Sequence, residues 1–124
     1  MGGVTIKRID ACDYYQGPNA VPGIKFRTAG RQLGVTAWGM NVLDLEAGCT
    51  GYPEHDHVQD GQEEVYVVLN GSATLVTSAG EFPVEAGMLI RVAADTKRKF
   101  LPGQDGLRLL AIGGTPGQAY PQSR

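Results

Sequence analysis

Short runs of β-branched and aromatic residues alternate along the chain with clusters of Gly, Pro, Asn and Asp. This pattern is typical of an all-β sandwich or barrel. It predicts a long strand over 35–45 that bends at Gly39, an earlier strand over 24–28, and later strands over 64–69, 72–76, 81–84, 88–92, 97–101 and 107–112. The 18 Gly and 7 Pro residues interrupt the windows in which an amphipathic helix would run, so we expect little helix. The result is a meander of roughly eight or more strands.

Turns are predicted where Gly, Pro, Asn and Asp gather between these strands. The sequence places them at 85–87, 93–96 and 102–106. The strongest turn signal is Asn70-Gly71, because both residues tolerate the positive φ of a type I′ hairpin turn. We therefore expect 64–69 and 72–76 to form a β-hairpin.

The strand over 64–69 has two largely apolar faces. Alternate side chains point to opposite sides of a strand, so Glu64, Tyr66 and Val68 share one face, and the residues between and after them share the other. In a single closed sandwich the outer face would be polar, so an apolar outer face predicts a partner subunit. We expect a homodimer, and a monomeric mass by light scattering would contradict this expectation.

Length, charge and hydropathy limit what kind of protein this is. The chain has 124 residues, the size of one domain, and a formal net charge of -2. That charge balance gives no field that would draw nucleic acid or an anionic membrane. No segment reaches the run of about twenty apolar residues that spans a bilayer, and no apolar signal core follows Met1. We expect a soluble cytoplasmic protein with no nucleic-acid or membrane partner.

The candidate chemistry centres on the two histidines of the chain, His55 and His57. On an extended backbone, residues i and i+2 project to one face, so both imidazoles can converge on one point. Glu64 from the next strand would complete the set. Two imidazoles and a carboxylate suit a divalent ion of Fe, Mn, Ni or Zn, with positions left open for substrate or water. No organic cofactor is implied.

The stretch 48–71 resembles the first motif of the cupin superfamily. It has a glycine turn, then Pro53-Glu54-His55-Asp56-His57, then Glu64 seven residues before the turn glycine Gly71. The resemblance implies a small single-domain cupin of residues 1–124. In that reading 1–30 is an N-terminal arm, about 35–114 is a double-stranded β-helix, or jelly-roll, barrel, and 115–124 is a flexible tail. It also implies that His55, His57 and Glu64 are the metal ligands, with Glu63 on the opposite face.

The stretch 80–100 resembles the second cupin motif but departs from it at one position. Arg98 stands where the family has its third metal-binding histidine. Arg98 is also the middle residue of Lys97-Arg98-Lys99, so its side chain faces opposite to its neighbours. A guanidinium about 5 Å from a divalent ion would repel it by roughly 6–7 kcal/mol at an effective dielectric near 20. Either Arg98 is turned away or paired and a two-histidine, one-glutamate site remains, or its guanidinium takes the place of the metal and pairs with Glu64.

The remaining pocket residues and the function stay open at this point. Alongside Arg98, the residues Tyr52, Tyr66, Phe100, Trp38 and Met40 are candidates to bind a small polar or anionic ligand, although apolar residues at strand spacing are also ordinary core. The first hypothesis is a metal-dependent oxygenase, isomerase or lyase. The second is a non-catalytic ligand-binding or sensing cupin, and the third is a structural domain with a vestigial pocket. The fold alone does not choose among them.

Overall fold

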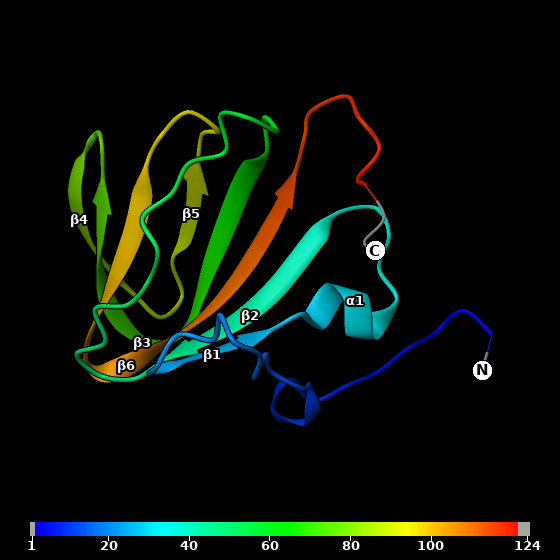
Figure 1. The fold of residues 1–124 in the computed structure, drawn as a ribbon, viewed down its shortest axis with the longest axis horizontal. Helices are drawn as coiled ribbons and strands as arrows, with labels where there is room; N and C mark the ends of the chain where they lie inside the picture. The colour runs from blue at the N-terminus through cyan, green and yellow to red at the C-terminus, as the bar shows by residue number, and fades with distance from the viewer. Residues whose placement is uncertain (1, 122–124) are drawn as a thin grey trace.

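The computed structural model describes residues 2–121, which form two short helices and six strands. In chain order these are η1 (Ile9–Ala11), β1 (Ile24–Arg27), α1 (Ala29–Leu33), β2 (Gly39–Leu45), β3 (Glu63–Thr77), β4 (Gly80–Glu85), β5 (Leu89–Val92) and β6 (Arg98–Gly114). All named strand pairs are antiparallel (Figure 1). The predicted all-β fold with little helix is confirmed. None of the helices in the described range is long and apolar enough to cross a membrane.

The two longest strands, β3 and β6, bend in the middle and take part in two layers. The first half of β3 pairs with β5 and with the second half of β6, which in turn pairs with β2. The second half of β3 pairs with β4 and with the first half of β6. The two layers face each other in the predicted jelly-roll arrangement, and β1 pairs with β2 at one edge (Figure 1).

The predicted hairpin at Asn70-Gly71 is wrong, because β3 runs through these residues without turning back. A type I′ turn needs positive φ at both central residues, but only Gly71 has it, at 79°. The register of β3 against β6 shifts between Val68 and Asn70 and again between Gly71 and Ala73. The Asn-Gly pair therefore forms a β-bulge that bends the strand rather than a loop that ends it.

This bulge lets both halves of β3 face the interior. Before it the inward residues are Tyr66 and Val68, each 1% exposed, and after it Ala73 and Leu75 are inward in the opposite phase, at 7% and 4%. Residues 73–77 pair with 98–102 instead of folding back onto 64–69. Long-range pairing has overridden the local turn preference.

The predicted turn at 102–106 is wrong in the same way, because β6 continues from Arg98 to Gly114. Its pairing with β3 skips 103–106, so these residues form an irregular bend within the strand. A Cβ on Gly71 would overlap the Gly106 carbonyl, so a glycine at position 71 is needed where the two bent strands meet. Two pairs of predicted strands are thus each one strand, which reduces the count to six among the described residues.

Other local predictions are confirmed, with one shortened strand. Strands form within 24–28, 81–84 and 88–92, and the turns at 85–87 and 93–96 are present. The strand predicted over 35–45 begins only at Gly39. The five-residue helix α1 precedes it and ends at Gly34, which has a left-handed φ of 88°. Residues 35–38 connect this helix to β2.

The interior is lined by apolar side chains from every layer, while one outer face stays partly apolar. The main buried cluster includes Leu43, Tyr66, Val68, Leu75, Phe100 and Leu109. On the outer face of β3, Val65 and Leu69 are each 40% exposed. Such exposure agrees with a face that a second subunit would cover, but the homodimer stays a prediction.

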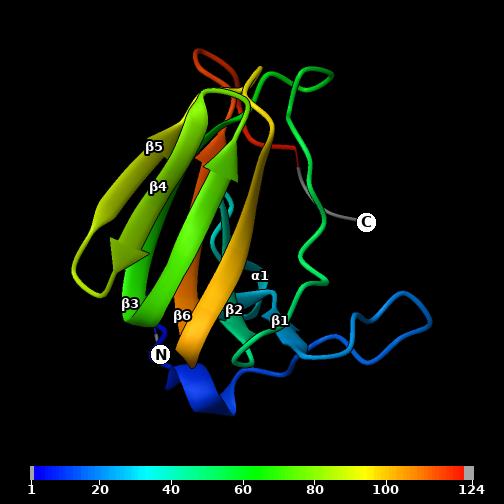
Figure 2. The ribbon, with the colours of Figure 1, turned by 90° about the vertical axis from the view of Figure 1, so that its left-hand side faces the viewer.

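Two segments lie outside the barrel. Residues 2–8 extend away from it, and 46–62 run along its open side (Figures 1 and 2). Within the predicted arm of 1–30, β1 is a strand of the sheet. In the predicted tail, the Tyr120 hydroxyl lies against Gly39. Residues 122–124 of that tail, like Met1, lie outside the described residues.

Candidate functional site

The backbone of the segment 46–62 is hydrogen-bonded at His55 to the start of β6 and at His57 to the turn before it. The His55 amide donates to the Arg98 carbonyl at 3.2 Å, and the Arg98 amide donates to the His55 carbonyl at 2.9 Å. The His57 amide donates to the Ala94 carbonyl at 2.8 Å. Since directly paired residues of an antiparallel bridge project to the same face, His55 and Arg98 point together into the barrel.

Each imidazole is oriented through its Nδ1 atom. Nδ1 of His55 lies 2.9 Å from the Pro53 carbonyl, and Nδ1 of His57 lies 3.1 Å from a carboxylate oxygen of Asp60. A carbonyl and an ionised carboxylate only accept, so both Nδ1 atoms carry a proton and donate it. In the neutral form of each ring the lone pair is therefore on Nε2, which is the arrangement found in histidines that bind metals.

The two Nε2 atoms converge on Glu64, which projects inward from β3. They lie 3.8 Å (His55) and 3.3 Å (His57) from Glu64 Oε1. The Tyr66 hydroxyl donates to the same oxygen at 2.5 Å. Glu63 lies on the opposite face of the strand, where it accepts from Arg91 Nε at 2.6 Å. The structure thus separates the two glutamates as strand alternation predicts.

Arg98 is fully buried and faces the same oxygen, so it is not turned away from the site. Its NH1 atom lies 3.6 Å from Glu64 Oε1, and its NH2 atom donates to the Ala93 carbonyl at 3.1 Å. Within the described part of the chain, Nε and NH1 of Arg98 have no hydrogen-bond acceptor. Leaving buried charged donors unpaired is costly, so these two atoms indicate a site that is incomplete without a ligand or water.

The charges of this cluster fix its protonation. Burial opposes ionisation of Glu64, but His55 and Tyr66 beside it, and the charges of His57 and Arg98, outweigh burial and hold the pKa of Glu64 below its ordinary value. The carboxylate of Glu64 raises the pKa of His55 against the effect of burial. Burial raises the pKa of Tyr52 to about 12, and it also raises that of Tyr66. Glu64 is therefore an anion, and both tyrosines are neutral hydrogen-bond donors.

Three of the aromatic candidates lie beside the cluster. The Phe100 ring is 5.4 Å from the Tyr52 ring and 5.0 Å from the Tyr66 ring, and Tyr52 lies 5.9 Å from the His55 ring. All three are buried, and they form the floor of the site as well as part of the core. They can orient a ligand only through the hydroxyls of Tyr52 and Tyr66.

Two other candidates are not brought to the cluster. Met40 packs on the other side of β2, against a small cluster of Cys12, Ala29 and Val42. It does so because Leu43, and not its neighbour Val42, faces the barrel interior. Trp38 is 46% exposed in the segment before β2. The prediction that Met40 lines the pocket is therefore wrong, and Trp38 is a surface residue.

Two residues that the sequence analysis did not single out belong near the site. Asp60 orients His57, as described above. Asn41 pairs across the sheet with Ala111, which pairs with Tyr66, so all three share the inner face. The spacing of three residues between His57 and Asp60 could have indicated that Asp60 accepts a hydrogen bond from His57. Asn41 could have been recognised as a polar residue in phase with Leu43 and Leu45 on β2.

The donor set fits a divalent metal ion. One ligand atom from each of His55, His57 and Glu64 lies within 4.8 Å of the others. Two imidazoles and a carboxylate form a facial set that leaves positions open. The buried Arg98 takes the place of a further protein ligand and adds positive charge. The residues can therefore hold a metal, although less tightly than a site with a third imidazole.

Solved structures with similar folds were found, whereas no family model and no curated protein matches the chain. A cupin protein from Bacteroides fragilis is 22% identical with a TM-score of 0.64, covering 90% of this chain and 92% of that one. A sugar phosphate isomerase of the cupin superfamily from Silicibacter pomeroyi is 22% identical with a TM-score of 0.69, covering 88% and 75%.

A third similar structure is that of a predicted oxalate decarboxylase from Thermotoga maritima. It is 17% identical with a TM-score of 0.67, covering 89% of this chain and 96% of that one. Likeness at these identities concerns the fold and does not carry an activity. The chain therefore has the cupin fold, an all-β jelly-roll barrel that encloses His55, His57, Glu64 and Arg98.

Proposed function

We propose that the barrel pocket binds one divalent metal ion through His55, His57 and Glu64, together with a small anionic molecule. The observation that carries this proposal is the orientation of the two imidazoles. Both Nδ1 atoms are held by acceptors, so both Nε2 lone pairs are directed at the Glu64 carboxylate. A divalent ion held by both Nε2 atoms and the carboxylate accounts for this convergence.

Arg98 is the reason to propose an anionic ligand. Its guanidinium is fully buried, and two of its nitrogens lack acceptors among the described residues. A metal ion and Arg98 together bring more positive charge than Glu64 neutralises, and an anionic oxygen would offset that excess. Metal and anion should therefore bind cooperatively, each tightening the binding of the other by the same factor.

The chemistry follows from these groups. When bound, the metal supplies Lewis acidity at a carboxylate or phosphate oxygen. Tyr66 keeps its proton and holds Glu64 in place, while Arg98 orients the anion by charge. An oxygenase, isomerase or lyase can use such a centre. Two of the similar proteins are described as a sugar phosphate isomerase and a predicted oxalate decarboxylase, and sugar phosphates and oxalate are anions.

A second candidate function is metal-free binding or sensing of an anion. It is favoured by the 3.6 Å between Arg98 NH1 and Glu64 Oε1, an oxygen to which Tyr66 already donates. In that case the guanidinium neutralises Glu64 in place of a metal, and the histidines supply hydrogen bonds. Metal content separates the two candidates.

The test is elemental analysis of protein purified without chelators, followed by calorimetric titration with Mn²⁺, Fe²⁺, Ni²⁺ and Zn²⁺. We expect near-stoichiometric binding of at least one ion. Replacing His57→Ala or Glu64→Gln should weaken it by about 100-fold or more, because even outer-shell partners of metal ligands are worth about 10–100-fold. The matched control is Glu63→Gln, which lies on the other face of the same strand and should leave affinity unchanged.

Two results would contradict the metal proposal. One is a wild-type protein that takes up none of these ions, which would favour the metal-free candidate. The other is metal binding that survives both His57→Ala and Glu64→Gln, which would place the ion elsewhere in the molecule.

A further inference from the structure

A cavity of about 250 Å³ adjoins the candidate metal site. It lies between the loop before β1, the inner face of β1 and the segment that carries the histidines. Its wall is mainly apolar and includes Val21, Ile24, Phe26, Leu43 and Tyr52. His55 and Asn19 add polar side chains. The cavity is thus an apolar space with a metal-ligating imidazole in its wall.

The apolar wall is unusual because it faces inward without being filled. Ile24 and Phe26 pair across β1–β2 with Leu45 and Leu43, so all four side chains share the inner face of the sheet. Leu43 and Leu45 are buried, at 7% and 3% exposed, whereas Phe26 remains 38% exposed. Interior apolar surface of this kind gains free energy when an apolar group covers it.

The cavity and the metal site share a wall. His55 lines the cavity, and its Nε2 atom lies 3.8 Å from Glu64 Oε1. Tyr52 also lines the cavity, and its ring packs 5.4 Å from Phe100 on the floor of the site. His55 and Tyr52 thus belong both to the cavity wall and to the surroundings of Glu64, so a molecule with its polar end at the metal site has the cavity beside it.

We propose that the ligand of this protein is an organic anion with an apolar tail, whose charged end lies at His55, His57, Glu64 and Arg98 and whose tail fills this cavity. The inference rests on the proposed function, and it narrows the ligand class from any small anion to an alkyl or aryl carboxylate or phosphate. This class follows from the charged groups at the metal site and from the apolar lining of the cavity beside it. A compact dianion such as oxalate would leave the cavity unused.

The cavity volume sets the size of the tail. A dry apolar cavity of about 150 Å³ in another protein accommodates benzene. The larger cavity here is therefore wide enough for a phenyl ring or a short alkyl chain. Burial of each added methylene is expected to tighten binding about fourfold until the cavity is full.

The experiment measures binding of acetate, butyrate, hexanoate and phenylacetate to Mn²⁺-loaded protein by calorimetry. We expect affinity to rise about fourfold per methylene from acetate to butyrate, and phenylacetate to bind more tightly than acetate. Proton NMR gives a second readout, since Mn²⁺ should broaden the protons next to the carboxylate more than those of the terminal methyl group.

Substitution of Ala20→Trp tests where the tail lies. Ala20 is an exposed loop residue in the cavity wall, so a large side chain there should occupy the space without disturbing the core. We expect hexanoate to bind this variant no better than acetate, with Mn²⁺ and acetate binding unchanged. The matched control is Gln16→Trp, an exposed position in the same loop, which should keep the full preference for hexanoate.

The outcomes separate this inference from the proposed function. If Mn²⁺ and acetate bind but longer tails give no gain, or if the gain persists in Ala20→Trp, the inference is overturned and the proposed function stands. If neither Mn²⁺ nor acetate binds, the proposed function fails and the inference fails with it.

Discussion

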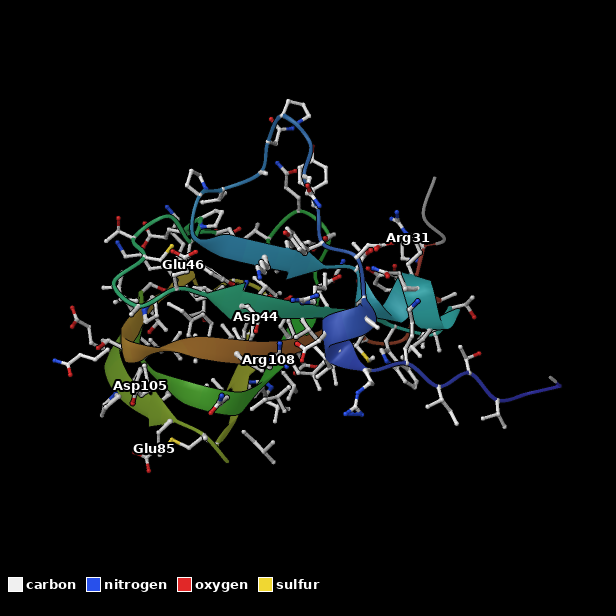
Figure 3. The ribbon with its side chains drawn as sticks, turned by 90° about the horizontal axis from the view of Figure 1, so that it is seen from below. Arg31, Asp44, Glu46, Glu85, Asp105 and Arg108 are labelled. Atoms are coloured by element: carbon white, nitrogen blue, oxygen red, sulfur yellow. The ribbon has the colours of Figure 1, made fainter. Side chains whose placement is uncertain are left out.

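Two arginine–carboxylate clusters among the described residues differ in how completely they are hydrogen-bonded. The outer network consists of Asp10, Arg27, Asp44 and Arg108 and lies on the outside of the sheet, where Asp44 of β2 pairs with Arg108 of β6 (Figure 3). Asp44 accepts from Arg27 Nε at 3.2 Å and from Arg108 Nε and NH2 at 2.6 and 3.0 Å. Arg27 NH1 also donates to the Cys12 carbonyl at 2.7 Å.

The site cluster of His55, His57, Glu64 and Arg98 is looser, although Arg98 is the more deeply buried arginine. Arg98 approaches Glu64 only to 3.6 Å and keeps two nitrogens without acceptors among the described residues. A buried ion pair stabilises a fold only when its geometry is close and its remaining donors are paired. The contrast indicates that the outer network holds the sheet together, whereas the site cluster is arranged for a ligand.

The largest effect is expected from breaking the outer network. Asp44→Ala leaves Arg27, which is 5% exposed, without its carboxylate, and among the described carboxylates it leaves Arg108 paired with Asp10 alone. Loss of one partner of a buried ion pair costs about 3 kcal/mol or more. We expect the free energy of unfolding in urea to fall by about 2–4 kcal/mol, since Asp44 is itself 24% exposed. Mn²⁺ binding should be unchanged.

Asp105→Ala is the control for this substitution. Asp105 is an exposed carboxylate in the bend of β6, three residues before Arg108 (Figure 3), and its loss should change stability by no more than about 0.5 kcal/mol. An Asp44→Ala protein as stable as Asp105→Ala would mean that the outer network contributes little, and the contrast between the clusters would lose its basis.

Arg98→Met in the site cluster is expected to have a smaller effect on stability than Asp44→Ala and, unlike it, to change metal affinity. This change removes a poorly paired buried charge, while Glu64 keeps its contacts with Tyr66 and both histidines. Stability should change by less than about 1 kcal/mol, because the contact that is lost is loose, at 3.6 Å, and the substitution also removes two buried donors that lack acceptors among the described residues. Affinity for Mn²⁺ should rise about tenfold, or about 1.4 kcal/mol. This is a fraction of the roughly 6–7 kcal/mol of repulsion between a guanidinium and a divalent ion 5 Å apart.

The same variant should bind acetate less tightly, by about tenfold, because a hydrogen bond to a charged group is worth about 1.5–3 kcal/mol. Arg91→Met is the matched control, since Arg91 of β5 pairs with Glu63 on the outer face of β3. Calorimetry on the two variants checks both affinities. If Arg98→Met instead unfolds the protein or leaves both affinities unchanged, Arg98 is a structural residue.

Sequence patterns predicted the fold better than the connections within it. Strand alternation placed Glu64 and Glu63 on opposite faces, and it turned Arg98 inward between two lysines. The hairpin at Asn70-Gly71 could not be excluded locally, because a glycine with positive φ serves a bulge as well as a turn. Only the pairing of 73–77 with β6, residues distant in sequence, decides between them.

Within the site, predictions failed where both faces of a strand look alike or where a loop folds back. Met40 and Val42 are as apolar as Leu43 and Leu45, so the composition of β2 does not reveal which pair faces inward. Asp60 reaches His57 only through the conformation of the turn between them, which hydrophobic periodicity does not encode. The histidine pair was easier to find because its spacing is itself the geometry.

The smallest effect is expected from acid, and it tests the outer network alone. Burial opposes ionisation of Asp44, but hydrogen bonds and charges of Arg108 and Arg27 outweigh it and hold the pKa of Asp44 below its ordinary value of 3.8. The stability that this ion pairing contributes is therefore complete above the unfolded pKa and is lost as the pH falls through the lower folded pKa. Below about pH 4 the unfolded chain binds a proton that the folded one does not.

Asp44→Asn should accordingly lose less stability than the wild type between pH 4 and pH 2, with a slope shallower by at most about 1.4 kcal/mol per pH unit. Urea midpoints across this range measure the slope. Glu64 also has a lowered pKa, but it titrates in both proteins, so its contribution cancels in the comparison. Equal slopes would mean that Asp44 has the same pKa in the folded and unfolded chains, and the outer network would then hold the sheet by packing rather than by charge.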